Sequence, residues 1–166
     1  MTVFTATQTF AAQPQCNVHI TDIRTAKSAE DGKRPLLLGD WAAVTLPHDW
    51  NWHTAAAADD VWYRLDWIPD CPPGHRQSIA LLLRSIVMAG EVYINDHFLW
   101  RDEHLVEPFS RSWNMPRYWL LPDVWLNDGV NTVWIRVVGI KHQTIGLGAV
   151  QIGNAGKLNQ EYENLW

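Results

Sequence analysis

The sequence has no uninterrupted run of about 18 apolar residues, so we expect no membrane-spanning helix within these 166 residues. Clusters of basic residues are also missing. The 13 Lys and Arg residues are scattered and the formal net charge is −5, which argues against a nucleic-acid partner. Apolar spacing typical of helices is nearly absent. Apolar residues still make up 47% of the chain, which predicts one globular domain with a sizeable core.

The motifs of common enzyme classes are absent as well. The chain contains no G-x-S-x-G, no H-E-x-x-H and no phosphate-binding glycine-rich loop. Asp102, Glu103 and Glu107 are the types of residue that serve as acid and nucleophile in glycosidases, but they share one loop. His48 and His53 share another loop without the spacing of a metal site. We therefore predict a non-catalytic chain that holds no metal and no cofactor.

The chain has only two cysteines, Cys16 and Cys71, and neither belongs to a C-x-x-C pair. They form either two free thiols or one disulfide that ties the N-terminal segment to the domain. A disulfide across a loop of this length stabilises by about 4 kcal/mol in the chain-entropy model, and it implies an oxidising compartment. Residues 1–13 lack the basic and apolar regions of a secretory signal, so we expect residues 1–15 to be a leader or flexible segment.

The stretch from Val61 to Pro69 has a clear strand pattern, because it is rich in aromatic and β-branched residues, and Pro69 is expected to end the strand. Alternation predicts one apolar face that meets the core, made of Val61, Tyr63, Leu65 and Trp67. The opposite face places Trp62 beside Arg64. A fully solvated face rarely holds such a pair, so we expect this second face to be half covered.

Further strand-like segments follow, separated by turn signals: 17–23, 41–46, 77–87, 91–95, 97–101, 117–121, 131–140 and 146–152. Asn95-Asp96 suits a tight hairpin turn, because both residues tolerate positive φ. The predicted loops are 24–34, 48–60 and 102–116. Residues 157–166 are expected to begin a helix. Many short strands with little helix predict an all-β sandwich.

Tryptophan is unusually abundant, with 11 residues. Core packing explains them in one interpretation, because Trp is highly buried on average. The other interpretation is a platform on which sugar rings or another flat ligand stack. Such a site also needs polar groups for hydroxyls or carboxylates. The candidate ligand-binding residues are Trp50, Trp52, His53, Arg64, Arg101, Glu107, Arg111, Trp113 and Asn114.

Each candidate also has a purely structural interpretation. Trp50 and Trp113 are alternatively plugs at the ends of the sandwich. Arg64 alternatively pairs with an acidic neighbour such as Asp66, and Arg111 bonds to loop carbonyls. Binding and architecture therefore both stay open for these residues.

Five sequence blocks occur in a characteristic order: LPHDW (46–50), VWYRLDW (61–67), EVYINDHFL (91–99), NMPRYWLLP (114–122) and DGVNTVWIRVVG (128–139). This order resembles the N-terminal sugar-binding jelly roll of family 2 glycoside hydrolases, a galactose-binding-like sandwich. The resemblance covers residues 41–153. The pattern is also similar to periplasmic sensor domains of bacterial membrane receptors, which SRSWNMPRYW (110–119) and the two cysteines fit best.

The resemblance implies a galactose-binding-like jelly-roll β-sandwich over residues 16–156, with residues 157–166 leading toward a membrane helix. It implies a disulfide between Cys16 and Cys71, a periplasmic location and a small polar ligand, with carbohydrate as one candidate. The chain would be the non-catalytic, membrane-tethered sensing part of a sensor histidine kinase or diguanylate cyclase, with a homodimer as one possible state. The alternatives are a carbohydrate-binding accessory domain of a family 2 glycoside hydrolase and a structural protein-interaction sandwich.

Overall fold

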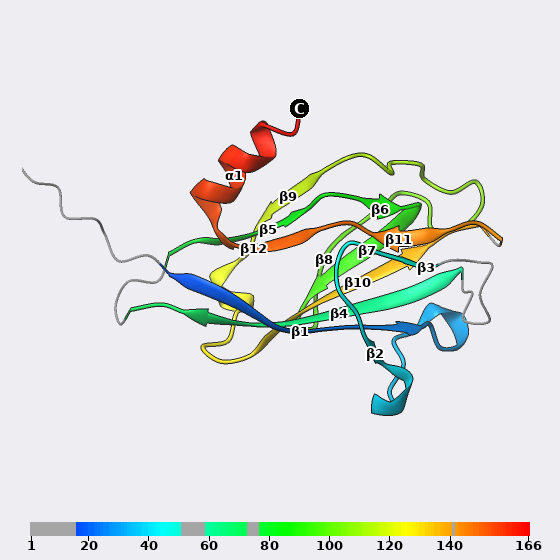
Figure 1. Ribbon diagram of the computed structural model, residues 1–166, viewed down its shortest axis with the longest axis horizontal. Coiled ribbons are helices and arrows are strands. Elements are labelled where there is room, and N and C mark those ends of the chain that lie inside the picture. Colours follow the sequence, from blue (N-terminus) through cyan, green and yellow to red (C-terminus); the bar gives the residue numbers. More distant parts are fainter. Residues whose placement is uncertain (1–15, 51–58, 73–76, 141) are drawn as a thin grey trace, which may run out of the picture.

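The computed structural model describes residues 16–50, 59–72, 77–140 and 142–166, without the side chain of Leu38. The predicted central strand is β4, the third strand of a six-stranded antiparallel sheet (Figure 1). In spatial order this sheet contains β2 (Ala42–Ala43), β1 (Asn17–Lys27), β4 (Asp60–Asp70), β10 (Asn131–Val138), β7 (Ala89–Ile94) and β8 (His97–Arg101).

A second layer lies across the core from this sheet and is built from two three-stranded sheets (Figure 1). One contains β3 (His48–Trp50), β11 (Ile145–Leu147) and β6 (Ile86–Val87), and the other contains β12 (Val150–Asn154), β5 (Ile79–Leu83) and β9 (Arg117–Leu120). The amide of Gly148 donates to the carbonyl of Ser85 at 2.9 Å, and that of Arg84 donates to Ala149 at 3.0 Å. These bonds join the two small sheets end to end into one layer.

The core fills the space between the layers. The predicted inner face of β4 is completely buried, since Val61, Tyr63, Leu65 and Trp67 are each 0% exposed. The opposite face of β4 is largely covered too, with Trp62 buried and Arg64 half-buried. Both predictions for this strand, and the predicted all-β sandwich, are confirmed.

The one α-helix among the described residues, α1 (Ala155–Glu163), covers the outer face of β12, β5 and β9. Leu158 of α1 packs with Ala80 and Leu82, which explains why both faces of β5 are apolar. Asn154 caps the helix by accepting a hydrogen bond from the amide of Lys157 at 3.0 Å. Three short 3-10 turns complete the described structure: Glu30–Gly32, Leu38–Asp40 and Asp123–Trp125.

Several strand boundaries differ from the prediction. The first strand was predicted to end at Ile23, but β1 continues to Lys27 because Thr25 and Ala26 are buried against β4. Pro69 does not end β4. Beyond Trp67 this strand pairs with β1 alone, and a proline is tolerated where one side of a strand has no partner.

Four further predictions along the chain were also wrong. The predicted strand 77–87 is interrupted between β5 and β6, and the predicted strand 146–152 is likewise two strands, β11 and β12. The predicted strand 41–46 shrinks to the two residues of β2, whereas residues 48–50, predicted as loop, form β3 beside β11. Strand pairing across the second layer decides these boundaries, and pairing partners are not visible in local residue patterns. The hairpin at Asn95-Asp96 is confirmed, with Asn95 at φ 53°.

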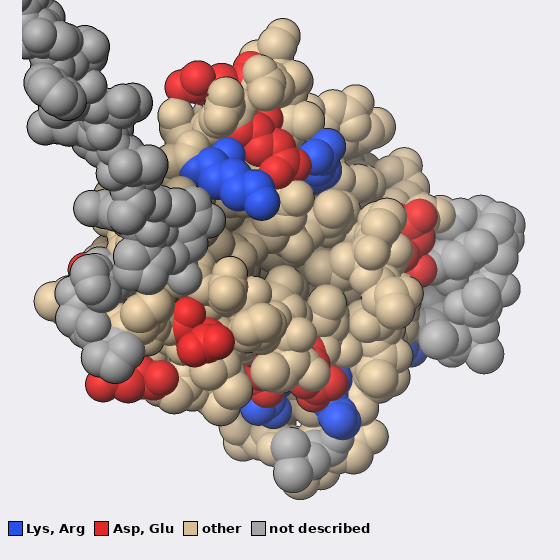
Figure 2. Space-filling model, turned by 60° about the vertical axis from the view of Figure 1, so that its left-hand side comes forward, with Lys and Arg blue, Asp and Glu red and all other residues tan. Residues whose placement is uncertain are grey.

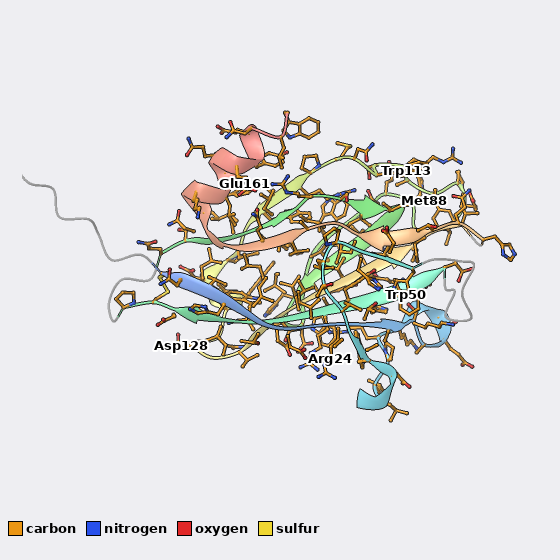
Figure 3. All side chains as sticks on the ribbon, viewed as in Figure 1. Arg24, Trp50, Met88, Trp113, Asp128 and Glu161 are labelled. Carbon is orange, nitrogen blue, oxygen red and sulfur yellow. A yellow bond between two sulfur atoms is a disulfide. The ribbon has the colours of Figure 1, made fainter. Side chains whose placement is uncertain are left out.

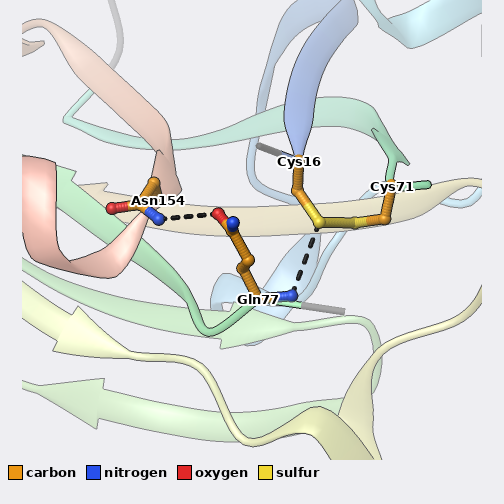
Figure 4. The surroundings of a disulfide bond; sticks show 4 residues. All are labelled: Cys16, Cys71, Gln77 and Asn154. Carbon is orange, nitrogen blue, oxygen red and sulfur yellow. Dashed lines mark hydrogen bonds between the residues drawn. A yellow bond between two sulfur atoms is a disulfide. The ribbon is translucent and has the colours of Figure 1, made fainter. Parts of the chain in front are cut away.

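Cys16 and Cys71 form a disulfide, with their Cα atoms 4.2 Å apart (Figure 4). It joins the start of β1 to the segment that follows β4. The amide of Gln77 donates to Cys16 Sγ at 3.4 Å, and Asn154 Nδ2 donates to Gln77 Oε1 at 2.9 Å. The disulfide is therefore linked to the residue that caps α1. None of the described helices is long and apolar enough to cross a membrane.

Candidate functional site

The predicted ligand-binding residues that lie in the described part of the chain do not converge on one site. Trp50 lies on β3, packs against the core and donates from Nε1 to Thr25 Oγ1 at 3.1 Å (Figure 3). Its neighbours are those of a structural residue. Trp52 and His53 lie outside the described residues.

Arg64 and Arg101 belong to the outer face of the six-stranded sheet. Arg64 Nη2 lies 2.7 Å from Asp66 Oδ2, the ion pair expected in the structural interpretation, and its guanidinium lies 5.6 Å from the ring centre of Trp134. Arg101 is exposed and is paired in register with Glu91 of β7. These two arginines thus face away from the core.

The remaining candidates lie on the loop between β8 and β9, which we call the 102–116 loop. Glu107, Arg111, Trp113 and Asn114 are all exposed on it, and Trp113 is 41% exposed (Figure 3). This exposure argues against Trp113 as a plug of the sandwich. Their role in ligand binding stays a prediction.

A pocket of about 330 Å³ lies directly beside this loop. It forms where β8 and β9, each the last strand of its sheet, are joined by the 102–116 loop and flanked by α1. We call it the edge pocket, and its lining residues are Trp100, Asp102, Ser112, Met115, Pro116, Arg117, Tyr118, Trp119 and Tyr162.

The polar part of the edge pocket is a hydrogen-bonded set of three side chains, of which Asp102 and Arg117 are buried and Ser112 is half-buried. Arg117 Nη2 donates to Ser112 Oγ at 2.6 Å, and Ser112 Oγ donates to Asp102 Oδ1 at 2.8 Å. Asp102 Oδ2 accepts from the amide of Gly90 at 2.9 Å, and Arg117 Nη1 donates to the carbonyl of Met115 at 3.0 Å. These bonds fasten the 102–116 loop to both layers of the sandwich.

Burial has the largest effect on the pKa of Arg117 in this set. Desolvation lowers the pKa of the Arg117 guanidinium below its ordinary value, while the Asp102 carboxylate and their hydrogen bond act in the opposite direction. A guanidinium remains charged at any physiological pH. The pocket therefore holds a positive charge whose counter-charge is already in place.

Aromatic rings form the walls of the edge pocket. The guanidinium of Arg117 lies 4.6 Å from the ring centre of Trp100, and the rings of Trp100 and Trp119 lie 5.5 Å apart. Tyr118 contacts Tyr162 of α1, with ring centres 5.8 Å apart. Apolar rings beside a cation and a hydroxyl suit a small ring-shaped molecule that carries hydroxyl or carboxylate groups.

The sequence analysis missed most of this pocket. Of its lining residues only Asp102 was weighed, as a possible catalytic acid, and Arg117, Tyr118 and Trp119 were interpreted as an ordinary strand. The available signal was the pair of aromatic residues directly after Pro116 and Arg117 in the predicted strand 117–121. The sequence alone does not show which faces of the strand Tyr118 and Trp119 occupy, nor that Trp100 contacts Trp119.

Metal chemistry finds no support in the described part of the chain, where no group of three or more His, Cys, Asp or Glu side chains could hold a metal ion. The surface charges are mixed rather than segregated. Figure 2 shows a face on which basic side chains lie beside acidic ones. Among the ion pairs of the surface, Arg84 Nη2 and Glu161 Oε1 of α1 lie 2.6 Å apart.

Comparison with solved structures shows which known domains share this fold. The chain is similar to a glycosyl hydrolase family 2 member from Bacteroides cellulosilyticus, with a TM-score of 0.55 and 16% identity over 84% of this chain and 21% of that one. It is similar to Bacteroides uniformis β-glucuronidase 2, with a TM-score of 0.57 and 17% identity over 83% and 18% of the two chains. It is also similar to a β-glucuronidase of an uncultured Clostridium, with a TM-score of 0.57 and 15% identity over 90% of this chain and 30% of that one.

The fold is a β-sandwich like those of family 2 glycoside hydrolases. At these identities the likeness shows the fold alone, and the chain spans about a fifth to under a third of the three enzymes' lengths. No family model and no curated protein sequence matches the chain.

Proposed function

We propose that this chain is a non-catalytic binding domain that takes a small polar ligand, a sugar or sugar acid, in the edge pocket. The observation that carries the proposal is the hydrogen-bonded Arg117–Ser112–Asp102 set in a pocket lined by aromatic rings. Aromatic faces suit the CH faces of a sugar ring, and an arginine suits hydroxyl or carboxylate oxygens.

The carboxylates of the region support a binding role over a catalytic one. Asp102 already accepts hydrogen bonds from Ser112, Gly90 and Arg117. Glu103 and Glu107 are exposed on the loop. A glycosidase needs two carboxyl groups that flank one bond, with one of them kept protonated. Asp102 is thus already engaged by three donors that hold the loop in place.

Two roles for such a domain are each favoured by an observation. The structural neighbours are family 2 glycoside hydrolases, several named β-glucuronidases, which supports an accessory carbohydrate-binding domain of such an enzyme. The contact of Tyr162 with the edge pocket supports the second role, the extracytoplasmic sensing domain of a membrane receptor. A ligand that orders the pocket would then change the packing of α1, provided it binds one arrangement more tightly than the other.

The binding proposal is tested by titrating neutral monosaccharides and uronic acids against the intact chain, with affinity measured by calorimetry. Tyr118→Ala removes one wall of the pocket and is expected to weaken binding by about tenfold, the equivalent of one lost ring contact. Phe98→Ala is the matched control, because Phe98 is a 51% exposed aromatic residue on the outer face of the large sheet. The edge pocket would be refuted as the site if none of the compounds bound, or if Tyr118→Ala and Phe98→Ala lost the same amount of affinity.

The two roles are separated by a different pair of observations. In the sensing role, amide NMR signals of α1 shift when ligand binds, and Tyr162→Ala reduces that shift without abolishing binding. In the accessory role the α1 signals stay unchanged. The rest of the gene is informative too: an apolar run of about 20 residues downstream of Trp166 supports the receptor, and a barrel domain supports the glycosidase.

A further inference from the structure

Three aromatic rings form a cage on the outer face of the six-stranded sheet, away from the edge pocket. Trp62 of β4, Trp134 of β10 and Tyr93 of β7 lie on neighbouring strands, and Trp134 is directly opposite Tyr93 in register. The rings of Trp62 and Tyr93 are 5.9 Å apart and tilted by 41°. This arrangement leaves a space that all three rings border.

A cation of the chain itself occupies that space. The guanidinium carbon of Arg34 lies 4.6 Å from the ring centre of Trp134 and 5.9 Å from those of Trp62 and Tyr93. All three distances are within the range of cation–π attraction, which draws a cation to the negative faces of aromatic rings. Arg34 thus shows what kind of group the cage accepts.

Arg34 is held more loosely than the residues around it. Its ion pair with Asp96 is 3.4 Å long, and the Asp96 side chain is 92% exposed, so the pair contributes little. Pro35 accepts a long hydrogen bond from Trp41 Nε1 at 3.4 Å, and the next two residues are hardly packed, since Leu36 is 96% exposed and Leu37 is 70% exposed. A shift of this short segment would release the guanidinium from the cage.

The residues just before Arg34 are firmly seated by contrast. Trp62 Nε1 donates to the carbonyl of Gly32 at 2.9 Å. Gly32 adopts φ +71° against the guanidinium of Arg136, where a Cβ would come within 1.6 Å of Nη2. A hinge between Gly32 and Arg34 would therefore let the arginine move while the residues before it stay in place.

The cage adjoins a pocket of about 520 Å³ between this segment and the sheet. Glu91, only 7% exposed, lines it and accepts hydrogen bonds from Tyr93 at 3.2 Å and Arg136 at 3.3 Å. Arg34, which pairs with Asp96, also lines this pocket. A cation that replaces Arg34 would find aromatic faces, a nearby carboxylate and room for the rest of the molecule.

We propose that the Trp62–Tyr93–Trp134 cage is a binding site for a small organic cation with a quaternary ammonium group, and that Arg34 occupies it when no ligand is bound. The quaternary ammonium class follows from the chemistry of the cage, because its methyl groups spread the positive charge over a surface that aromatic rings contact well. The site shares no lining residue with the edge pocket, so it stands whether or not a sugar binds there.

The test uses choline chloride, with sodium chloride at equal ionic strength as the salt control and 3,3-dimethylbutan-1-ol as the uncharged analogue of the same shape. Arg34→Ala empties the cage and is expected to bind choline at least about tenfold more tightly than the unaltered chain, because the competing cation is gone. Arg34→Lys, which keeps a cation, should stay close to the unaltered chain. Tryptophan fluorescence reports binding, and circular dichroism checks the fold.

Two controls connect binding to the cage. The uncharged analogue should bind at least about tenfold more weakly than choline, and Trp134→Ala in the Arg34→Ala background should abolish saturable binding. Equal binding of choline and its uncharged analogue would show an apolar pocket instead of a cation site and would overturn the proposal. So would a folded Arg34→Ala variant that does not respond to choline.

A second measurement uses the unaltered chain and does not depend on how the variants fold. The Arg34 side-chain Nε–H signal in NMR should be displaced by the ring currents of the cage. Saturating choline is expected to move it to the position of a solvent-exposed arginine. A signal that stays constant throughout the titration would contradict the displacement of Arg34.

Discussion

Arg117 Nη2 lies 3.4 Å from Asp102 Oδ1, and the two side chains are only 8% and 7% exposed. They belong to opposite ends of the 102–116 loop, one at the end of β8 and the other at the start of β9. A buried pair of charges at the two ends of a loop holds the loop closed at its base. The edge pocket depends on this closure, since both residues line it.

The first prediction concerns this pair. Asp102→Ala leaves the Arg117 charge buried without its partner and should lower the free energy of unfolding by about 3–5 kcal/mol. Asp22→Ala is the matched control, because its ion pair with Arg24 is short, at 2.6 Å, but exposed, and it should cost less than about 1 kcal/mol. Urea denaturation measures both. Similar losses in the two variants would mean that burial does not set the strength of the Asp102 pair.

The second prediction compares two of the tryptophans first considered for ligand binding. Trp50 packs against the core and bonds to Thr25, so Trp50→Ala should lower the free energy of unfolding by about 2–4 kcal/mol. Trp113 is 41% exposed on its loop, so Trp113→Ala should cost less than about 1 kcal/mol. Thermal melts of the two variants decide the order. A larger loss of stability for Trp113→Ala than for Trp50→Ala would instead indicate that Trp113 is a plug at the end of the sandwich.

The third prediction is a pH dependence that begins at His48. His48 Nδ1 lies 3.0 Å from the hydroxyl of Tyr63, and desolvation lowers the pKa of His48 from 6.5, only partly opposed by Asp49. Burial also raises the pKa of Tyr63, so its hydroxyl stays protonated.

The folded state therefore favours neutral His48, and the unfolded chain binds the proton more readily. The stabilisation is complete above pH 6.5 and is lost as the pH falls through the lower folded-state pKa. His48→Gln should flatten this part of the curve when urea midpoints are compared from about pH 8 to about pH 5. An unchanged slope in the variant would assign the pH dependence to other groups.

The fourth prediction concerns the disulfide. Cys16 and Cys71 are separated by 55 positions, so opening the bridge frees a long loop in the unfolded chain. Replacing both by Ser should lower the free energy of unfolding by about 4 kcal/mol in the chain-entropy model. The unaltered chain under reducing conditions should match this variant. Thiol titration of the oxidised, denatured chain supplies the check, and two reactive thiols per chain would disprove the bridge.

The sequence pattern by itself predicted those features of the fold that do not depend on which strands pair. The alternation through Val61–Trp67 was enough to separate the core face of β4 from its outer face, because the side chains of a strand alternate whatever lies beside it. The turn at Asn95-Asp96 was equally local, since positive φ depends on the residue itself. The all-β class followed from many such short segments.

Only the tertiary structure decided which side chains meet. Among the candidate ligand-binding residues that the structure describes, Arg64 and Arg101 lie on the outer face, Trp50 packs against the core, and Trp113 is exposed. The edge pocket and the Arg34 cage were invisible in the sequence, because each collects residues from strands that are distant along the chain. A residue's own chemistry is written in the sequence, whereas its neighbours are set by strand order and register, which depend on the packing of the whole domain.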